Sequence, residues 1–227
     1  MTRDSATRDP VTIVTFDWVP PFAQGYVRDI RPRWAAEEAG IPYQVETVPV
    51  GPKSAAHRAM QPFEQVPVLK DGATQLFESG AIVLHLTEGS ELLPADRRTE
   101  VMQWLIAALN SVEPQVMEWN TARLFDKDEA AATRANKRLQ PRLAQLAAVL
   151  DGREWLLGDV FTAADILMVD AVRGIGDDGA LDDHSVLKDY VARGTARPAF
   201  KRAMDAHMAH WGAAESARAT AETAPAS

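Results

Sequence analysis

The order of its secondary-structure patterns constrains the fold of this chain more than any other feature. Up to residue 88, patterns typical of strands and helices follow one another in the order β-α-β-α-β-β-α. A parallel crossover followed by a closing hairpin predicts a small mixed sheet covered by helices. The expected strands cover 11–16, 43–48, 66–70 and 74–77, and the expected helices cover 27–39, 54–60 and 79–87.

The second half of the chain has a different character. After Leu93-Pro94, long segments rich in Ala, Leu, Arg and Glu show helical spacing with almost no strand pattern. Thr162 and Asp165 have the spacing of a capping box before an apolar helix over 163–172. The other expected helices cover 97–120, 128–150, 185–193 and 198–211. We therefore predict an α+β protein with two domains, one around a mixed sheet and one all-helical.

These patterns also predict where the domains begin and end. The tail after Trp211 lacks large apolar residues, so we expect it to stay disordered. The predicted parts are a disordered arm over 1–10, a sheet domain over 11–88, a linker over 89–96, a helical domain over 97–211 and a disordered tail over 212–227.

Composition excludes several classes of protein. With 46% hydrophobic and 25% charged residues, the chain has the composition of a soluble globular protein, and no apolar run approaches the ~20 residues that span a bilayer. A net charge of −8 argues against nucleic acid as a partner. The polar N-terminal segment does not resemble a signal peptide, so we expect a cytoplasmic protein. The chain has no cysteine, so any sulfur chemistry depends on a ligand.

Two motifs of the sheet domain point to a ligand site. Val66-Pro67 begins an apolar run, where a cis peptide bond would turn the backbone groups of Val66 towards a cleft. Glu78-Ser79 precedes a helix whose first N–H groups suit a carboxylate. Taken singly, such a proline is usually structural and such a serine is usually a helix cap. Their combination, at this spacing and in this element order, favours ligand binding.

These motifs and the element order resemble the glutathione S-transferase family. The stretch 61–69 is similar to the family's approach to its cis-proline, 78–82 to its glutamyl-binding turn, and 33–40 to the end of its first helix. The resemblance spans roughly 11–211. It implies a thioredoxin-like N-terminal domain, an all-helical C-terminal bundle, glutathione as co-substrate and a homodimer.

The resemblance also implies a place for each part of glutathione. The cysteinyl unit would pair with the backbone of Val66 beside a cis Pro67, and the γ-glutamyl end would meet Glu78 and Ser79. Lys53 lies twelve positions before Gln65, the spacing at which several classes of the family place a lysine for the glycyl carboxylate. Gln65 would add a further polar contact.

At the catalytic position the sequence departs from the family's pattern. The family lowers the pKa of the glutathione thiol with a Ser, Cys or Tyr side chain near the first strand and helix, because the thiolate is the nucleophile. Counting back from Gly40 puts Tyr26 at the position of the serine classes and Phe22 at that of the tyrosine classes, and Phe22 cannot donate a hydrogen bond. The resemblance therefore implies Tyr26 as the donor, with the Arg28 guanidinium as the alternative.

The acceptor substrate would bind next to this position. Phe22, Trp119 and Arg123 are the candidates for its pocket, although aromatic residues on a helix are more often core or dimer contacts. The acidic residues over 177–184 lack metal-ligand spacing, and so do His207 and His210, which we interpret as surface or interface residues. We therefore expect no metal site.

Together these inferences predict a glutathione transferase that activates glutathione as a thiolate for attack on a small electrophilic or peroxide acceptor. Two alternatives stay open. One is a glutathione-dependent disulfide or peroxide reductase that uses no protein cysteine. The other is a non-catalytic binding protein that has kept the fold.

Overall fold

The computed structural model describes residues 9–176 and 178–223 of the chain. Most of the arm predicted over 1–10 therefore lies outside the described residues. The chain forms two compact units, which are treated separately below. The sheet unit combines the chain up to Leu86 with the segment from Pro198 onwards, and the helical unit covers Thr87–Arg197. Among the described helices, none has both the length and the apolar character needed to cross a membrane.

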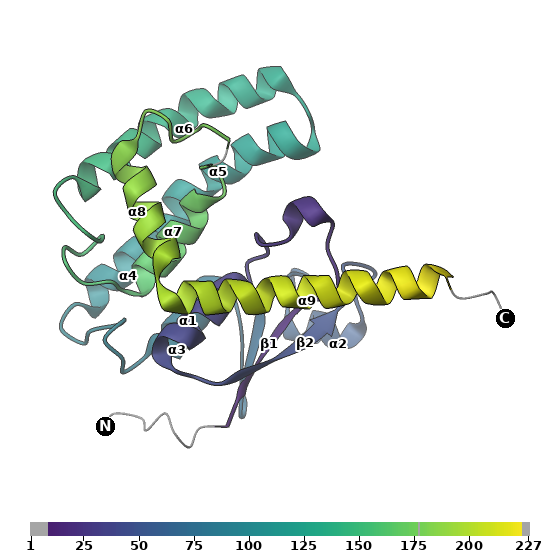
Figure 1. Cartoon of the computed structure of the whole chain (residues 1–227). Coiled ribbons are helices and arrows are strands. Elements are labelled where there is room, and N and C mark those ends of the chain that lie inside the picture. Colours follow the sequence, from purple (N-terminus) through teal and green to yellow (C-terminus); the bar gives the residue numbers. More distant parts are fainter. Residues whose placement is uncertain (1–8, 177, 224–227) are drawn as a thin grey trace. The chain divides into compact units, whose positions relative to one another are not determined.

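A four-stranded mixed sheet forms the centre of the sheet unit (Figure 1), in agreement with the prediction. β1 is parallel to β2 and antiparallel to β3, and β3 is antiparallel to β4, which gives the order β2-β1-β3-β4. The third strand begins two residues later than expected, because Pro67 has no N–H to donate to a ladder. The strands are β1 (Val11–Phe16), β2 (Tyr43–Val48), β3 (Val68–Asp71) and β4 (Thr74–Phe77).

The register of the strands brings four strand ends to one edge of the sheet. Phe16 pairs with Val48, and Val68 pairs with both Val14 and Phe77. Thus β1, β2 and β4 end where β3 begins, and this edge is called the carboxyl edge below. Val14, Val48 and Val68 pack together as a buried apolar cluster just beneath it. The segments that leave the sheet here therefore start from a rigid base.

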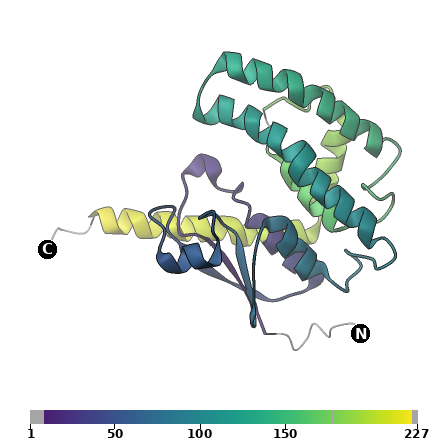
Figure 2. The ribbon, with the colours of Figure 1, turned by 180° about the vertical axis from the view of Figure 1, so that it is seen from behind.

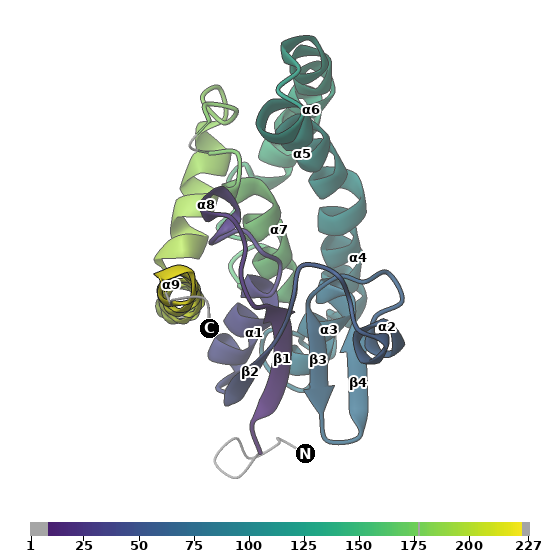
Figure 3. The same ribbon diagram turned by 90° about the vertical axis from the view of Figure 1, so that its right-hand side faces the viewer.

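Among the residues that the structure describes, four α-helices complete the sheet unit. α9 lies alongside α1 (Figure 3), where Trp34 meets Phe200 edge to face at 4.9 Å and Arg202 pairs with Glu37 at 2.7 Å. The sequence assigned residues 198–211 to the helical domain, but these contacts with α1 group α9 with the sheet unit. The helices are α1 (Ile30–Ala39), α2 (Ala55–Met60), α3 (Ser79–Thr87) and α9 (Pro198–Thr223).

The predicted disorder of the tail is wrong for the residues that the structure describes. α9 continues past Trp211 as far as Thr223, and residues 224–227 lie outside the described part. Two physical reasons account for the difference. The segment is rich in alanine, which has the highest helix propensity. In addition, its polar residues Glu215 and Arg218 contact Trp18, so the helix has a partner without a large apolar face.

The first helix also begins later than expected, at Ile30 instead of residue 27. The loop before it contains a 3-10 turn, η2 (Pro21–Ala23), and Ile30 N and Arg31 N donate three residues back, to the Val27 and Arg28 carbonyls, so residues 27–29 form tight turns instead of an α-helix. His207 is fully buried in α9, contrary to its interpretation as a surface or interface residue, and its Nδ1 lies 3.4 Å from Asp29 Oδ2. Asp29 in turn accepts a hydrogen bond from Arg33 Nε at 2.8 Å.

The helical unit is built around α7, which is buried along nearly its whole length. The capping box predicted for Thr162 and Asp165 is confirmed, and Tyr190 Oη donates to Asp165 Oδ1 at 2.9 Å. Burial raises the pKa of Asp165 in spite of these hydrogen bonds. A Cβ on Gly194 would come within 2.7 Å of Val169 Cγ2, so a glycine is needed where α8 crosses α7.

The long helix expected over 97–120 is interrupted by a π-helical turn just before Pro114, which lacks the N–H that a continuous helix requires. The helical segments of this unit are α4 (Arg98–Ala107), η3 (Ala108–Val112), α5 (Glu113–Asn120), η4 (Thr121–Phe125), α6 (Glu129–Leu150), α7 (Ala163–Arg173) and α8 (Ser185–Ala196).

Candidate functional site

The segment that enters β3 presents backbone groups at the carboxyl edge. The Val66–Pro67 peptide bond is cis. The ladders from β3 to β1 and to β4 both start at Val68, so Val66 lies just beyond their ends. Its side chain packs against the apolar cluster beneath the edge. The backbone at Val66 is therefore held firmly next to the sheet but outside its hydrogen-bond ladders.

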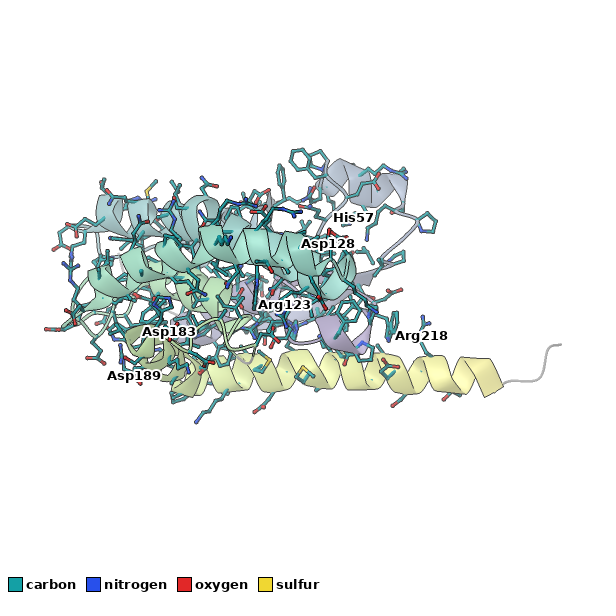
Figure 4. All side chains as sticks on the ribbon, turned by 90° about the horizontal axis from the view of Figure 1, so that it is seen from above. His57, Arg123, Asp128, Asp183, Asp189 and Arg218 are labelled. Atoms are coloured by element: carbon teal, nitrogen blue, oxygen red, sulfur yellow. The ribbon has the colours of Figure 1, made fainter. Side chains whose placement is uncertain are left out.

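Three polar side chains shape the chain before Val66. Ser54 Oγ accepts from His57 N at 3.1 Å as the cap of α2, and Gln61 Oε1 accepts from Phe63 N. His57, labelled in Figure 4, is 1% exposed, and its Nε2 lies 3.0 Å from the Gln65 carbonyl oxygen. Because a carbonyl only accepts, Nε2 carries the proton in this contact. The Gln65 side chain itself is exposed. His57 was not singled out in the sequence, where only its place three residues after Ser54 hinted at this role.

The turn from β4 into α3 lies at the same edge. Glu78 follows directly after Phe77 and has a φ of 71°, an unusual conformation for a residue with a side chain, and one that often occurs at functional sites. Ser79 is the first residue of α3 and is buried. Arg31 Nη1, itself buried, donates to Ser79 Oγ at 3.1 Å. A guanidinium therefore lies behind the N-terminus of α3, and together they favour an anion at this point.

Arg31 was not predicted as a site residue. The sequence offers one indication of its role. Arg31 lies two positions before Arg33 in a helix that should pack on the sheet, and a charged side chain buried there needs a partner.

Lys53 lies near the ends of β1 and β2. Its Nζ donates to the Pro49 carbonyl and stands 4.2 Å from the centre of the Phe16 ring. Burial lowers the pKa of Lys53, while the negative charges of Asp17 and Glu64 act in the opposite direction. The structure thus brings a lysine to the same edge of the sheet as Val66 and Glu78.

The residues expected to act on the thiol come from the loop between β1 and α1. This loop leaves the sheet at the carboxyl edge and carries Tyr26 and Arg28. Tyr26 is 47% exposed and Phe22 is 57% exposed, so neither side chain is part of the apolar core. Tyr26 N donates to the Ala23 carbonyl at 3.0 Å, which closes a turn after η2.

The other residues predicted for an acceptor pocket belong to the helical unit. Trp119 is buried in α5. Arg123, labelled in Figure 4, has its guanidinium 4.2 Å from the centre of the Trp119 ring. Arg123 also donates to Asp178 Oδ1 at 2.7 Å, and this pairing lowers the pKa of Asp178. Trp119, Arg123 and Asp178 belong to the helical unit, whereas Phe22 belongs to the sheet unit. The described residues contain no group of three His, Asp or Glu side chains placed to hold a metal ion.

Comparison with known proteins identifies the family of this chain. The chain matches the family models for the glutathione S-transferase N-terminal domain over residues 29–92 and for the C-terminal domain over residues 117–206. It is 31% identical over 158 residues to glutathione S-transferase 3 of Zea mays, covering 60% of this chain and 68% of that protein. The chain belongs to the glutathione S-transferase family.

Other members of the glutathione S-transferase family extend the comparison. Glutathione S-transferase F10 of Arabidopsis thaliana is 31% identical over 121 residues, a match that spans only 56% of that protein's length. A glutathione transferase of Burkholderia graminis, whose crystal structure holds two glutathione molecules per subunit, has a TM-score of 0.75 and 25% identity. That match covers 86% of this chain and 88% of the Burkholderia protein. The family and the two-domain fold predicted from the sequence are thus confirmed.

Proposed function

We propose that this protein binds glutathione at the carboxyl edge of its sheet unit and transfers it, as a thiolate, to a small electrophilic acceptor. The proposal rests on two features that lie at the same end of the β3–β4 ladder. The backbone of Val66 is outside the ladder, and Glu78, with its positive φ, directly precedes the N-terminus of α3. The bound glutathione of the Burkholderia relative supports the choice of ligand.

The γ-glutamyl end of glutathione carries one carboxylate and one ammonium group. The carboxylate would accept hydrogen bonds from the first N–H groups of α3 and from Ser79, whose hydroxyl is held by Arg31. The ammonium group would pair with the Glu78 carboxylate. The ligand carboxylate would thus meet the positive end of α3, and the ligand ammonium group would meet the negative charge of Glu78, the residue just before that helix.

The middle and the far end of the tripeptide would lie along the entry to β3. The cysteinyl unit would pair with the backbone of Val66 in the manner of an added strand, which gives affinity through main-chain hydrogen bonds. The glycyl carboxylate would pair with Lys53, and Gln65 would add a polar contact. This arrangement directs the sulfur towards the loop that carries Tyr26 and Arg28.

Activation of the thiol requires a modest amount of free energy. Lowering a thiol pKa from about 8.5 by about two units corresponds to ~2.7 kcal/mol. A hydrogen bond to a charged group contributes about 1.5–3 kcal/mol, so a single donor is sufficient. We propose the Tyr26 hydroxyl as this donor, with Arg28 as the alternative. The thiol proton passes to solvent, the sulfur forms a bond to the acceptor, and the leaving group departs with its electron pair.

The remaining elements of the proposal come from the family resemblance. Phe22, Trp119 and Arg123 are the candidate residues for contact with the acceptor. The protein would act as a homodimer in the cytoplasm.

Calorimetric titration with glutathione tests the proposal. We expect the wild type to bind at millimolar ligand or below, and Glu78→Gln to bind about tenfold more weakly, because the amide has no charge to pair with the ammonium group. Glu91→Gln, which neutralises an exposed carboxylate, serves as the matched control and is expected to bind like the wild type. Absence of binding by the wild type at millimolar glutathione would contradict the proposal.

A further inference from the structure

α9 contacts the loop that joins β1 to α1 (Figure 1, Figure 2). This loop covers residues 17–29. The contacting residues of α9 are three, four or seven positions apart and therefore share one face of the helix. They are Met204, Met208, Glu215 and Arg218.

The first contacts hold the start and the middle of the loop. His210 Nε2 lies 2.9 Å from the carbonyl oxygen of Phe16, the last residue of β1, and therefore donates a hydrogen bond to it. Further along the loop, Gly25 faces α9, and a Cβ on it would be in ordinary van der Waals contact with Met208 Sδ at 3.6 Å. It is the φ of 85° that favours glycine at this point.

Glu215 makes the contacts that join distant parts of the loop. Its Oε1 accepts a hydrogen bond from Trp18 Nε1 at 2.8 Å and another from Gln24 Nε2 at 3.2 Å. Gln24 Nε2 also lies 3.2 Å from the Val19 carbonyl, so the two ends of the η2 turn are tied together. Arg218, labelled in Figure 4, places its guanidinium 4.1 Å from the centre of the Trp18 ring. One carboxylate oxygen thus fixes both sides of the loop.

The backbone hydrogen bonds described for residues 20–26 form short turns. They join close neighbours, from Ala23 to Pro20, from Gln24 to Pro21 and from Tyr26 to Ala23. Contacts to a neighbouring element add to the local stability of such a segment. Hydrogen bonds to a charged acceptor are among the stronger ones that can supply this.

We propose that Glu215 is a positioning residue for the reaction. It ties Trp18 and Gln24 to α9 and thereby fixes the loop that presents the thiol-activating group. The inference rests on the proposed function for its catalytic part. Glu215 itself does not contact the reacting atoms. Loss of the side-chain oxygen that accepts both hydrogen bonds should loosen the loop and impair activation of the thiol, while the γ-glutamyl and cysteinyl contacts at Glu78 and Val66 remain.

The experiment uses the full chain and three variants. Glu215→Ala removes both hydrogen bonds, whereas Glu215→Gln keeps an oxygen that can accept them. Asp205→Ala removes an exposed carboxylate elsewhere on α9 and is the matched control. Each protein is measured by hydrogen exchange of peptides covering 17–29 and 66–79, by ultraviolet titration of the bound glutathione thiol, and by steady-state kinetics.

The expected pattern separates positioning from a general structural role. For Glu215→Ala we expect faster exchange in 17–29 but not in 66–79, a raised thiol pKa, and kcat reduced about tenfold with KM for glutathione within about threefold of the wild type. Glu215→Gln and Asp205→Ala should resemble the wild type. Unchanged exchange in 17–29 for Glu215→Ala would overturn the inference, as would faster exchange with unchanged thiol pKa and kcat. Lack of glutathione binding by the wild type would overturn the proposed function and the catalytic part of this inference, while the exchange rates would still decide whether Glu215 anchors the loop.

Discussion

Val66 and Glu78 lie at the end of a β-ladder, whereas Tyr26 and Arg28 lie on a loop that contacts α9, the last helix of the chain. The first pair directly flanks strands that are joined by main-chain hydrogen bonds and supported by the apolar cluster beneath them. The second pair depends on side-chain contacts such as that between Trp18 and Glu215, 197 positions apart. On the proposed function, ligand binding and thiol activation would be supported by separate parts of the sheet unit, and each could be disturbed separately.

The largest effect is expected at Asp29, where the loop enters α1. Asp29 is fully buried, and it contacts the charged Arg33 at 2.8 Å and the buried His207 at 3.4 Å. Asp29→Ala would leave the Arg33 charge buried without its partner, so we expect the free energy of unfolding to fall by about 3–5 kcal/mol. Chemical denaturation of the variant and of the exposed control Asp205→Ala measures this loss. A decrease below about 1 kcal/mol would show that Asp29 does not hold this end of the loop.

The same carboxylate should make stability depend on pH. Desolvation raises the pKa of Asp29, but His207 and Arg33 outweigh it, so the folded-state pKa lies below the ordinary value of 3.8. The unfolded state then binds more protons than the folded state as the pH falls through and below 3.8, and the stability present above this pH is lost. We expect Asp29→Asn to show a weaker loss of stability on acidification than the wild type. Parallel denaturation curves at several acidic pH values test this, and an unchanged pH dependence would contradict the assignment.

The next effect concerns binding alone. Arg31→Leu keeps an apolar side chain in the buried position but removes the donor to Ser79 and the charge behind the N-terminus of α3. Loss of hydrogen bonding to a charged group corresponds to about 1.5–3 kcal/mol, so we expect glutathione affinity to fall about 10- to 100-fold. Calorimetry on this variant and on Arg134→Leu, which replaces an exposed arginine, provides the comparison. Affinity within about twofold of the wild type would separate Arg31 from the binding half of the site.

A smaller effect, confined to activation, is expected for Tyr26→Phe. Removing the hydroxyl should raise the thiol pKa of bound glutathione and lower kcat about tenfold, or by ~1.4 kcal/mol in activation free energy. The dissociation constant of glutathione should stay close to that of the wild type, because the contacts at Val66 and Glu78 are retained. Unchanged turnover would remove Tyr26 from the mechanism and leave Arg28→Leu as the next variant to measure.

The smallest effect is expected in the helical unit. The ion pair between Arg123 and Asp178 is partly exposed to solvent, and such pairs typically contribute less than about 1 kcal/mol. Asp178→Asn should therefore change the unfolding free energy little and leave glutathione affinity unaltered. A marked loss of glutathione affinity in this variant would show that binding is not confined to the sheet unit.

Much of this arrangement could be predicted from the sequence, because it depends on local patterns. The strand over Tyr43–Val48, the helix over Ser79–Thr87 and the capping box at Asp165 follow from residue alternation and spacing, and the structure contains all three. The glutathione-binding and catalytic residues named from the sequence remain predictions.

The features that were missed depend on contacts between distant segments. The final turns of α9 lack the large apolar residues by which a packed helix is usually found, and they pack instead through Glu215 and Arg218 against Trp18. Arg31 and His57 act through partners 48 and 8 positions away that no local pattern specifies.

A structure of the protein with glutathione bound tests the central claim most directly. We expect the cysteinyl unit to pair with the backbone of Val66, the γ-glutamyl carboxylate to lie at Ser79, and the sulfur to face the loop over residues 17–29. Glutathione bound elsewhere, or bound at this edge with its sulfur turned away from that loop, would contradict the account.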